Sequence, residues 1–183
     1  MQGRKCRYIG FYSPVKRCLQ TSFSLVLGQL LAKRGRVLYL NFETCSGWEE
    51  ILVNSEFSQE NMADLLYYFK NIPKEFETCF RNAKAKLNEM DYIKPSLSFI
   101  DLQQMEEGEW ESFLEYVGRC GPYDFILMDF SDSLPDLLRI LKKCDRIYSV
   151  CSAESISVMK RKQYEILLKE LHQEGILANT RWC

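Results

Sequence analysis

The order of apolar and polar positions near the start of the chain predicts a strand, a loop and a helix. Residues 8–12 are apolar or aromatic, residues 13–20 form a more polar loop, and a helix is expected from Thr21. Its apolar side chains recur every three or four residues, as on one buried face: Phe23, Val26, Leu27, Leu30 and Leu31. Gly35 is expected to cap this helix, and residues 37–42 to form a second strand. The whole segment therefore predicts a βαβ unit.

The loop of this unit precedes a helix N-terminus, where unpaired N–H groups and the helix dipole attract phosphate. A continuous apolar run, residues 125–128, predicts a central parallel strand, and Asp129 follows at its C-terminal end. With Thr21 brought close by the fold, we expect Asp129 to hold Mg²⁺ directly or through water. The alternative, that Asp129 caps the next turn, is weaker because Ser133 already offers an N-cap there.

The middle of the chain is expected to be mainly helical. Asn61 can cap a helix with one apolar stripe, formed by Met62, Leu65, Leu66 and Phe69. A longer helix is expected from Pro73 to Asp91, with apolar residues at intervals of three and four: Phe76, Phe80, Ala83, Leu87 and Met90. A short edge strand at 92–95 and a loop as far as Leu102 should follow.

The last part of the chain predicts three more helices, at 109–118, 134–143 and 154–174, and a strand at 146–151. The buried stripe of the final helix should consist of Tyr164, Leu167, Leu168 and Leu171. No strand is expected after it, so the fold should lack one strand and the chain should be a piece of a longer protein. The fold class is α/β, a doubly wound, mostly parallel sheet flanked by helices.

Composition limits the classes of function. With 183 residues, 46% of them hydrophobic, the chain can form one domain that buries most of its apolar surface. Its net charge of −1 gives no global attraction to nucleic acid or to anionic membranes. The sequence has no apolar run long enough for a membrane span and no signal peptide, so we expect a cytoplasmic protein.

Cysteine and histidine usage argues against zinc, redox and triad chemistry. The eight cysteines include no CxxC pair, and the only histidine, His172, lies near the end of a charged helix. Most of the cysteines are expected to be small buried hydrophobes in a reducing compartment. Cys18 is the exception, because its place between Arg17 and a helix N-terminus can lower a thiol pKa, although an ordinary loop residue is the simpler interpretation.

Taken in order, SPVKRCLQTS, LLAKRGRVLYLNFE and YDFILMDFSD resemble the deviant Walker A loop, second strand and Walker B strand of the MinD/ParA ATPases. The family's usual loop is SxKGGxGKTT. Among its members, the chain is most similar to the atypical TadZ/CpaE-like pilus-assembly proteins with degenerate loops. The resemblance covers most of the chain and implies a P-loop NTPase-like fold.

Matched to the family's pattern, most of the catalytic positions are replaced. The signature lysine, which reaches the other subunit of a dimer, falls on Val15, and the phosphate-binding lysine falls on Gln20. The loop glycines fall on Lys16, Arg17 and Leu19, and the two strand aspartates on Asn41 and Glu43, which become candidate switch residues. The hydroxyl pair remains as Thr21 and Ser22. The resemblance therefore implies a nucleotide site at Lys16, Arg17, Cys18, Leu19, Gln20, Thr21 and Ser22.

These replacements weigh more against catalysis than against binding. Without the lysine and the water-orienting aspartate, we expect hydrolysis to be slower by roughly 10³ or more. Lys16, Arg17 and Thr21 are still expected to hold ATP and Mg²⁺ weakly, the alternative being a purely structural turn. By analogy with the family, Ser46 and Gly47 are also expected near the site, with a surface turn as the equal alternative.

The resemblance implies a localisation or assembly factor for pilus, division or partition machinery, recruited from the cytoplasm to the inner face of the membrane. A scaffold that has lost its nucleotide is the alternative, and an active ATPase with compensating residues is a third. Expected partners are a second copy of the chain, with Val15 at the contact, and proteins of the machine. Cations between Arg139 and Lys162 suggest DNA as a further partner, but we favour an ordinary charged surface.

Overall fold

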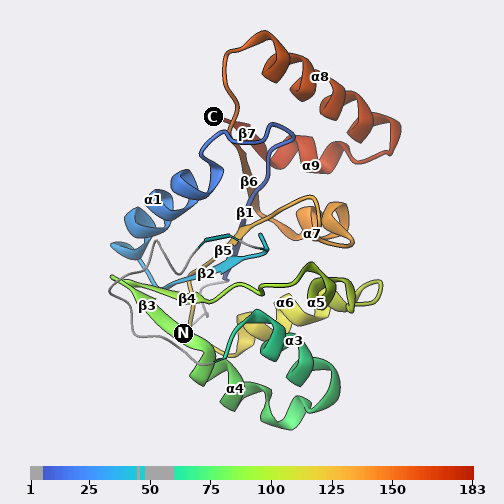
Figure 1. Cartoon of the computed structure of the whole chain (residues 1–183). Helices are drawn as coiled ribbons and strands as arrows, with labels where there is room; N and C mark the ends of the chain where they lie inside the picture. Colours follow the sequence, from blue (N-terminus) through green and yellow to red (C-terminus); the bar gives the residue numbers. More distant parts are fainter. Residues whose placement is uncertain (1–5, 45, 48–59) are drawn as a thin grey trace.

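The computed structural model describes residues 6–44, 46–47 and 60–183, and in this part of the chain it shows one seven-stranded sheet (Figure 1). The strand order is β3-β4-β2-β5-β1-β6-β7. Every neighbouring pair is parallel except β3 and β4. The strands are β1 (Arg7–Phe11), β2 (Val37–Asn41), β3 (Lys84–Leu87), β4 (Met90–Ile93), β5 (Phe125–Asp129), β6 (Arg146–Ser149) and β7 (Thr180–Trp182). The predicted doubly wound α/β class is confirmed.

Helices cover both faces of the sheet, as Figure 1 shows. The described helices are α1 (Gln20–Ala32), α3 (Met62–Asn71), α4 (Phe76–Ala83), α5 (Phe99–Gln103), α6 (Glu109–Arg119), α7 (Leu137–Lys143), α8 (Ser155–Glu170) and α9 (Glu174–Asn179), with a 3₁₀ turn, η1, at Pro73–Glu75. The larger core joins one face to α3, α4, α6 and α7, whereas α1 packs on the other face. None of the described helices combines the length and apolarity needed to cross a bilayer.

Three strand ends form one level row at the C-terminal edge of the sheet. Phe11 of β1 and Asn41 of β2 are both in register with Asp129 of β5, the strand between them. The chain leaves β1 there and enters α1 through residues 12–19. This is the crevice where open α/β sheets bind ligands.

The inner face of α1 matches the predicted stripe only in part, because Phe23, Leu27 and Leu31 pack against the core and the other two residues do not. Ser24 and Gly28 are its buried residues, whereas Val26 and Leu30 are 61% and 53% exposed. A Cβ on Gly28 would lie 2.5 Å from the Met90 sulfur, so a larger residue there would have to displace the Met90 side chain. Small residues can thus form the packing face of a helix, which apolar spacing alone does not reveal.

The predicted helix from Pro73 to Asp91 is wrong in its second half. Helix α4 ends at Ala83, and an antiparallel β3–β4 hairpin follows, with Asn88 in the left-handed conformation (φ 54°) at its turn. The apolar spacing there fits a helix and a strand almost equally well. Strand β4 also pairs with β2, so it is not an edge strand, and the loop predicted before Leu102 contains α5, capped by Ser98.

Left-handed residues also shift the later helices. Asp136 (φ 56°) precedes α7, so that helix begins at Leu137, and Ser133 bonds with Ser131. His172 (φ 54°) separates α8 from α9. In α8 the buried residues are Ser157, Tyr164 and Leu168, whereas Leu167 and Leu171 are exposed, contrary to the prediction. The strand thought to be missing is present as β7, which pairs with β6.

Candidate functional site

The loop between β1 and α1 contains two left-handed residues. Arg17 has φ 58° and Leu19 has φ 61°. Both fall at positions where the resembled loop has glycine, the residue that adopts this conformation freely. For other residues it costs roughly 1–2 kcal/mol each. The loop thus retains a glycine-type backbone path without glycine, which is strain of the kind found at functional sites.

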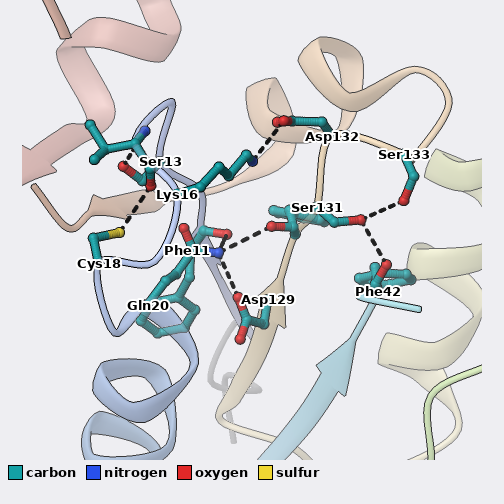
Figure 2. A network of polar contacts seen from close by, with 12 residues as sticks. Phe11, Ser13, Lys16, Cys18, Gln20, Phe42, Asp129, Ser131, Asp132 and Ser133 are labelled. Atoms are coloured by element: carbon teal, nitrogen blue, oxygen red, sulfur yellow. Dashed lines mark hydrogen bonds and ion pairs between the residues drawn. The ribbon is translucent and has the colours of Figure 1, made fainter. Parts of the chain in front are cut away.

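Short hydrogen bonds hold the first half of the loop in place (Figure 2). The Ser13 hydroxyl donates to the Val150 carbonyl at 2.6 Å and accepts from the Val15 N–H at 3.0 Å. The Cys18 thiol donates to the Val15 carbonyl at 3.0 Å. Cys18 therefore serves as a loop-closing donor in this arrangement.

Gln20, in place of the family's phosphate-binding lysine, points to the strand ends below the loop. Its Nε2 lies 2.7 Å from Oδ1 of Asp129, 3.2 Å from the Phe11 carbonyl and 3.1 Å from the Phe130 carbonyl (Figure 2). An amide group carries two protons, so these three acceptors share both of them. The neutral amide thus joins α1 to the ends of β1 and β5.

Asp129 is buried, and both of its carboxyl oxygens are hydrogen-bonded. Its Oδ2 accepts from the Tyr39 hydroxyl at 2.8 Å and from the Ser24 hydroxyl at 3.2 Å, and the side chain is 2% exposed. Burial raises the pKa of this carboxyl above its ordinary value, while hydrogen bonds from its neutral neighbours act in the opposite direction. Asp129 is thus the centre of a closed polar network whose hydrogen-bond donors are uncharged.

Lys16 is engaged on the other side of the loop. Its ammonium lies 2.7 Å from a carboxylate oxygen of Asp132 and 5.5 Å from the centre of the Tyr12 ring. Both members of the ion pair are about half exposed, so the pair contributes little stability, and Lys16 can leave it for another anion at low cost. Asp132 is thus the ion-pair partner of Lys16.

The two candidate switch residues lie beside this network. The fully buried Asn41 accepts the Glu43 N–H through Oδ1 at 2.8 Å, whereas its Nδ2 has no hydrogen-bond partner within the described structure. Burial and the nearby Asp129 raise the pKa of Glu43, while Lys16 and a hydrogen bond from Thr21 lower it. Thr21 also acts on Asp129, whose carboxyl pKa it lowers. That Thr21 and Asp129 together hold Mg²⁺ stays a prediction.

The loop encloses an open cavity of about 370 Å³. This volume lies within the range of about 300–1,000 Å³ typical of small-molecule sites. Its lining includes all the residues proposed for nucleotide binding, and it consists of Ser13, Val15, Lys16, Arg17, Cys18, Leu19, Gln20, Thr21, Ser22, Glu43, Phe130 and Ser131. Ser46 and Gly47 do not line it, and much of the segment expected around them lies outside the described residues.

Sequence reasoning missed the residues that complete the Asp129 network. Tyr39 lies inside an apolar strand and Ser24 inside a helix, so each looked like a core or packing position. Their hydroxyls lie 2.8 Å apart, and both reach the same carboxyl oxygen. The sequence did offer a signal. Tyr39 and Asn41 place polar groups at alternate positions of β2, and Ser24 places a hydroxyl one turn after the start of α1.

Mg²⁺ fits this arrangement only in part. The ion takes oxygen ligands at about 2.1 Å in near-octahedral geometry, usually one or two carboxylates with phosphate oxygens and waters. Thr21 and Glu43 are accessible oxygen donors at the cavity, but Asp129 does not line it and has both oxygens in use. Of the expected Thr21–Asp129 pair, Thr21 lines the cavity, whereas the buried Asp129 carboxyl group does not.

Three cations of the suspected basic surface form ion pairs within the chain. Arg139 of α7 pairs with Glu107 and Glu111, and Lys143 pairs with Glu115. The acidic face of α6 thus meets the cations of the neighbouring helix. In α8, Arg161 pairs with Glu165. The choice of an ordinary charged surface over a DNA-binding patch stays a prediction.

The fold is that of the ParA and MinD ATPases. The structure is similar to a ParA family ATPase from Chlorobium tepidum TLS, with a TM-score of 0.72 at 16% identity over 91% of this chain and 69% of that one. It is also similar to a plasmid partition protein from Borrelia burgdorferi B31 bound to AMPPNP, with a TM-score of 0.66 at 17% identity over 92% of this chain and 70% of that one. A third similar structure is the septum site-determining protein MinD complexed with Mg-ADP from Pyrococcus horikoshii OT3. Its TM-score is 0.65 at 14% identity over 97% of this chain and 68% of that one.

No protein-family model matches this sequence, and no curated protein matches it either. At such low identities, the structural likeness establishes the fold alone. What those proteins bind therefore enters only as support for a proposal.

Proposed function

We propose that this chain is a nucleotide-binding domain with little or no ATP hydrolysis, acting as a localisation or assembly factor. The observation that carries the proposal is the loop itself. Arg17 and Leu19 remain left-handed around an open cavity, although neither is glycine. Strain of this kind persists when the surrounding structure or a ligand requires it.

Binding is supported by the donors at the mouth of α1. The N–H groups of Gln20, Thr21 and Ser22 have no acceptor within the helix, since they belong to its first turn. Together with the helix dipole they favour an anion such as a phosphate group. Lys16 and the exposed Arg17 add positive charge that can move to a ligand. Two structural neighbours bind AMPPNP and Mg-ADP respectively.

Slow hydrolysis is supported by the side chains around the cavity. Phosphoryl transfer requires charge on the transferring group, which the neutral Gln20 and Val15 do not supply. Asn41 replaces an aspartate that would orient water, and its Oδ1 is used by the Glu43 N–H. We therefore expect turnover at least about 10³-fold below that of an intact site.

The cellular role follows the fold by analogy. Structural neighbours include plasmid partition and septum-site proteins, so positioning of a partition, division or pilus machine is the proposed process. Such a role needs self-association and protein partners more than turnover. Leu19, which is 75% exposed beside the cavity, is a suitable contact for a second copy. Recruitment to the inner face of the membrane would then depend on a partner.

A second candidate is a scaffold that binds no nucleotide. It is favoured by the network around Asp129, in which Gln20, Tyr39 and Ser24 satisfy the carboxyl group without a ligand. Such a network stabilises the strand ends by itself. In this case the cavity would be a by-product of the fold.

Calorimetric titration of the purified chain with ATP and with ADP distinguishes the two candidates. We expect weak binding, with no product formation above a mock-purified control. Arg17→Ala should weaken the binding, whereas Arg181→Ala, a change to an exposed arginine on β7, should leave it unchanged. An absence of heat and of competition with a fluorescent nucleotide would favour the scaffold. Turnover that survives repeated purification would contradict the proposed lack of hydrolysis.

A further inference from the structure

We propose that the loop binds its phosphate-bearing ligand without a divalent cation, and that Gln20 is the residue that keeps the metal ion out. This inference rests on the proposed nucleotide binding and specifies the form of the ligand. It departs from the expectation of a Thr21–Asp129 magnesium site.

The first argument is the occupancy of Asp129. A carboxylate that serves a metal ion must present a free lone pair to the cavity. Here Oδ1 accepts from Gln20 at 2.7 Å, and Oδ2 accepts from Tyr39 at 2.8 Å and from Ser24 at 3.2 Å. The side chain is absent from the cavity lining. A metal ion at Asp129 would therefore have to displace the Gln20 amide, and a buried donor left unpaired is costly.

The second argument is the position of Gln20 between Asp129 and the cavity. Its Nε2 also contacts the carbonyls of Phe11 and Phe130, which close the ends of β1 and β5. The amide is thus fixed by three acceptors from two strands. A lysine at this position would extend one positive charge toward a phosphate, whereas the amide covers the carboxyl group and leaves it out of reach.

The third argument is the balance of charge at the cavity. Lys16 and Arg17 are cations on the loop, and the ion-pair partner of Lys16, Asp132, is itself exposed. These two side chains and the N–H groups of the first helical turn can balance a phosphate group directly. Glu43 is the remaining carboxylate in the described lining, and Lys16 and Thr21 already act on it.

The decisive measurement is the affinity of the purified chain for ATP and for ADP, each in excess EDTA and in excess Mg²⁺ at constant ionic strength. We expect the same affinity in both conditions. Binding seen only with Mg²⁺, or tighter by about tenfold or more with it, would support the proposed function and overturn this inference. Binding in neither condition would overturn both.

Variants test the part assigned to Gln20. In Gln20→Asn the amide is too short to reach Asp129, so an oxygen should become available and a preference for Mg²⁺ should appear. The matched control is Gln29→Asn on the same helix, which loses a similar amide bond, to the Leu87 carbonyl at 2.8 Å, far from the loop. It should bind nucleotide as the wild type does. Gln20→Ala is the second variant, in case Gln20→Asn fails to fold.

A direct readout of the metal uses Mn²⁺ in place of Mg²⁺. Electron paramagnetic resonance of the chain with Mn²⁺ alone should show no bound ion in the wild type, and bound ion in a folded Gln20 variant. Bound Mn²⁺ in the wild type that disappears in Glu43→Gln would place the metal on Glu43 and would overturn the inference. If a folded Gln20 variant bound no Mn²⁺ and its nucleotide affinity did not depend on Mg²⁺, Gln20 would not be the residue that excludes the metal ion.

Discussion

The side-chain amide of Gln20 lies 2.7 Å from the carboxyl group of Asp129, across a separation of 109 residues in sequence. The contact joins the first residue of α1 to the last residue of β5. In the resembled family, a lysine and an aspartate occupy these two positions. In this chain a neutral amide contacts a buried carboxyl group, and stability and binding should both reflect this contact.

Gln20→Met should destabilise the fold by about 1–3 kcal/mol, because three acceptors lose their shared donor while the side-chain volume changes little. Gln29→Met removes a single bond to the Leu87 carbonyl and should cost about 1 kcal/mol or less. Chemical denaturation of both variants measures the difference. Equal losses would mean that the Gln20 contacts are no stronger than an ordinary partly buried amide bond.

Leu19→Gly should leave the stability unchanged or raise it by up to about 1 kcal/mol, because relief of the left-handed strain offsets the greater freedom of glycine in the unfolded chain. Ser22→Gly, three residues later in the first turn of α1, has no such strain to relieve and should cost about 0.5 kcal/mol. Thermal unfolding of the two variants provides the test. A loss in Leu19→Gly larger than in Ser22→Gly would show that the Leu19 side chain contributes contacts that outweigh the strain.

The Asp129 carboxyl group should contribute less to the free energy of unfolding as the pH rises from acid values. Because burial raises its pKa, the folded chain holds this proton above the unfolded value of about 3.9. Above that pH the folded state binds more protons than the unfolded state, so this group's contribution to the free energy of unfolding falls until the folded pKa is passed. The Asp129 carboxyl resonance, followed by ¹³C NMR, should titrate above the range of exposed aspartates.

The Tyr39 hydroxyl lowers the Asp129 pKa by donating to it, so Tyr39→Phe should move that titration to still higher pH. Tyr123→Phe is a suitable control, since it removes a tyrosine–carboxyl bond of the same length at Asp91. If the Asp129 titration moved equally in both variants, the pKa change would not be caused by loss of the Tyr39 hydrogen bond.

The order of elements in the βαβ unit and the position of its loop could be predicted because they depend on local patterns. Apolar runs identified β1, β2 and β5, and the parallel arrangement brought the start of α1 to the end of β5, where Gln20 contacts Asp129. The hairpin after Ala83 was missed because Ala83, Leu87 and Met90 recur at helical intervals, although Ala83, Ala85 and Leu87 also alternate as in a strand. Strand pairing decides the outcome. Local spacing carries no information about such a partner.

The internal contacts of the site could not be predicted for a related reason. Gln20 aligned with a lysine and was therefore treated as a weakened phosphate ligand, whereas its partners are the ends of two strands. The left-handed loop residues gave no composition signal either, because arginine and leucine rarely adopt that conformation. Their backbone follows from the closure of the loop between β1 and α1.

A homodimer is expected across the face that carries the loop, with Val15 and Leu19 at the contact. Val15 is partly buried by its own loop, whereas Leu19 is the more exposed apolar residue beside the cavity. In a two-fold interface, a residue at the centre meets its own copy, so an added charge there is repelled. Val15→Glu and Leu19→Glu should each convert a dimer to a monomer without unfolding the chain.

Val26→Glu provides the matched control, because Val26 is also an exposed apolar residue of this segment but lies two turns along α1 and outside the cavity lining. It should leave the dimer intact. Light scattering at tens of micromolar protein, with and without ATP, measures the oligomeric state, since protein concentration and ligand both shift an association of this kind. A monomer in both conditions would exclude the dimer. A dimer that resists both loop variants but dissociates in Val26→Glu would instead place the interface on the exposed face of α1.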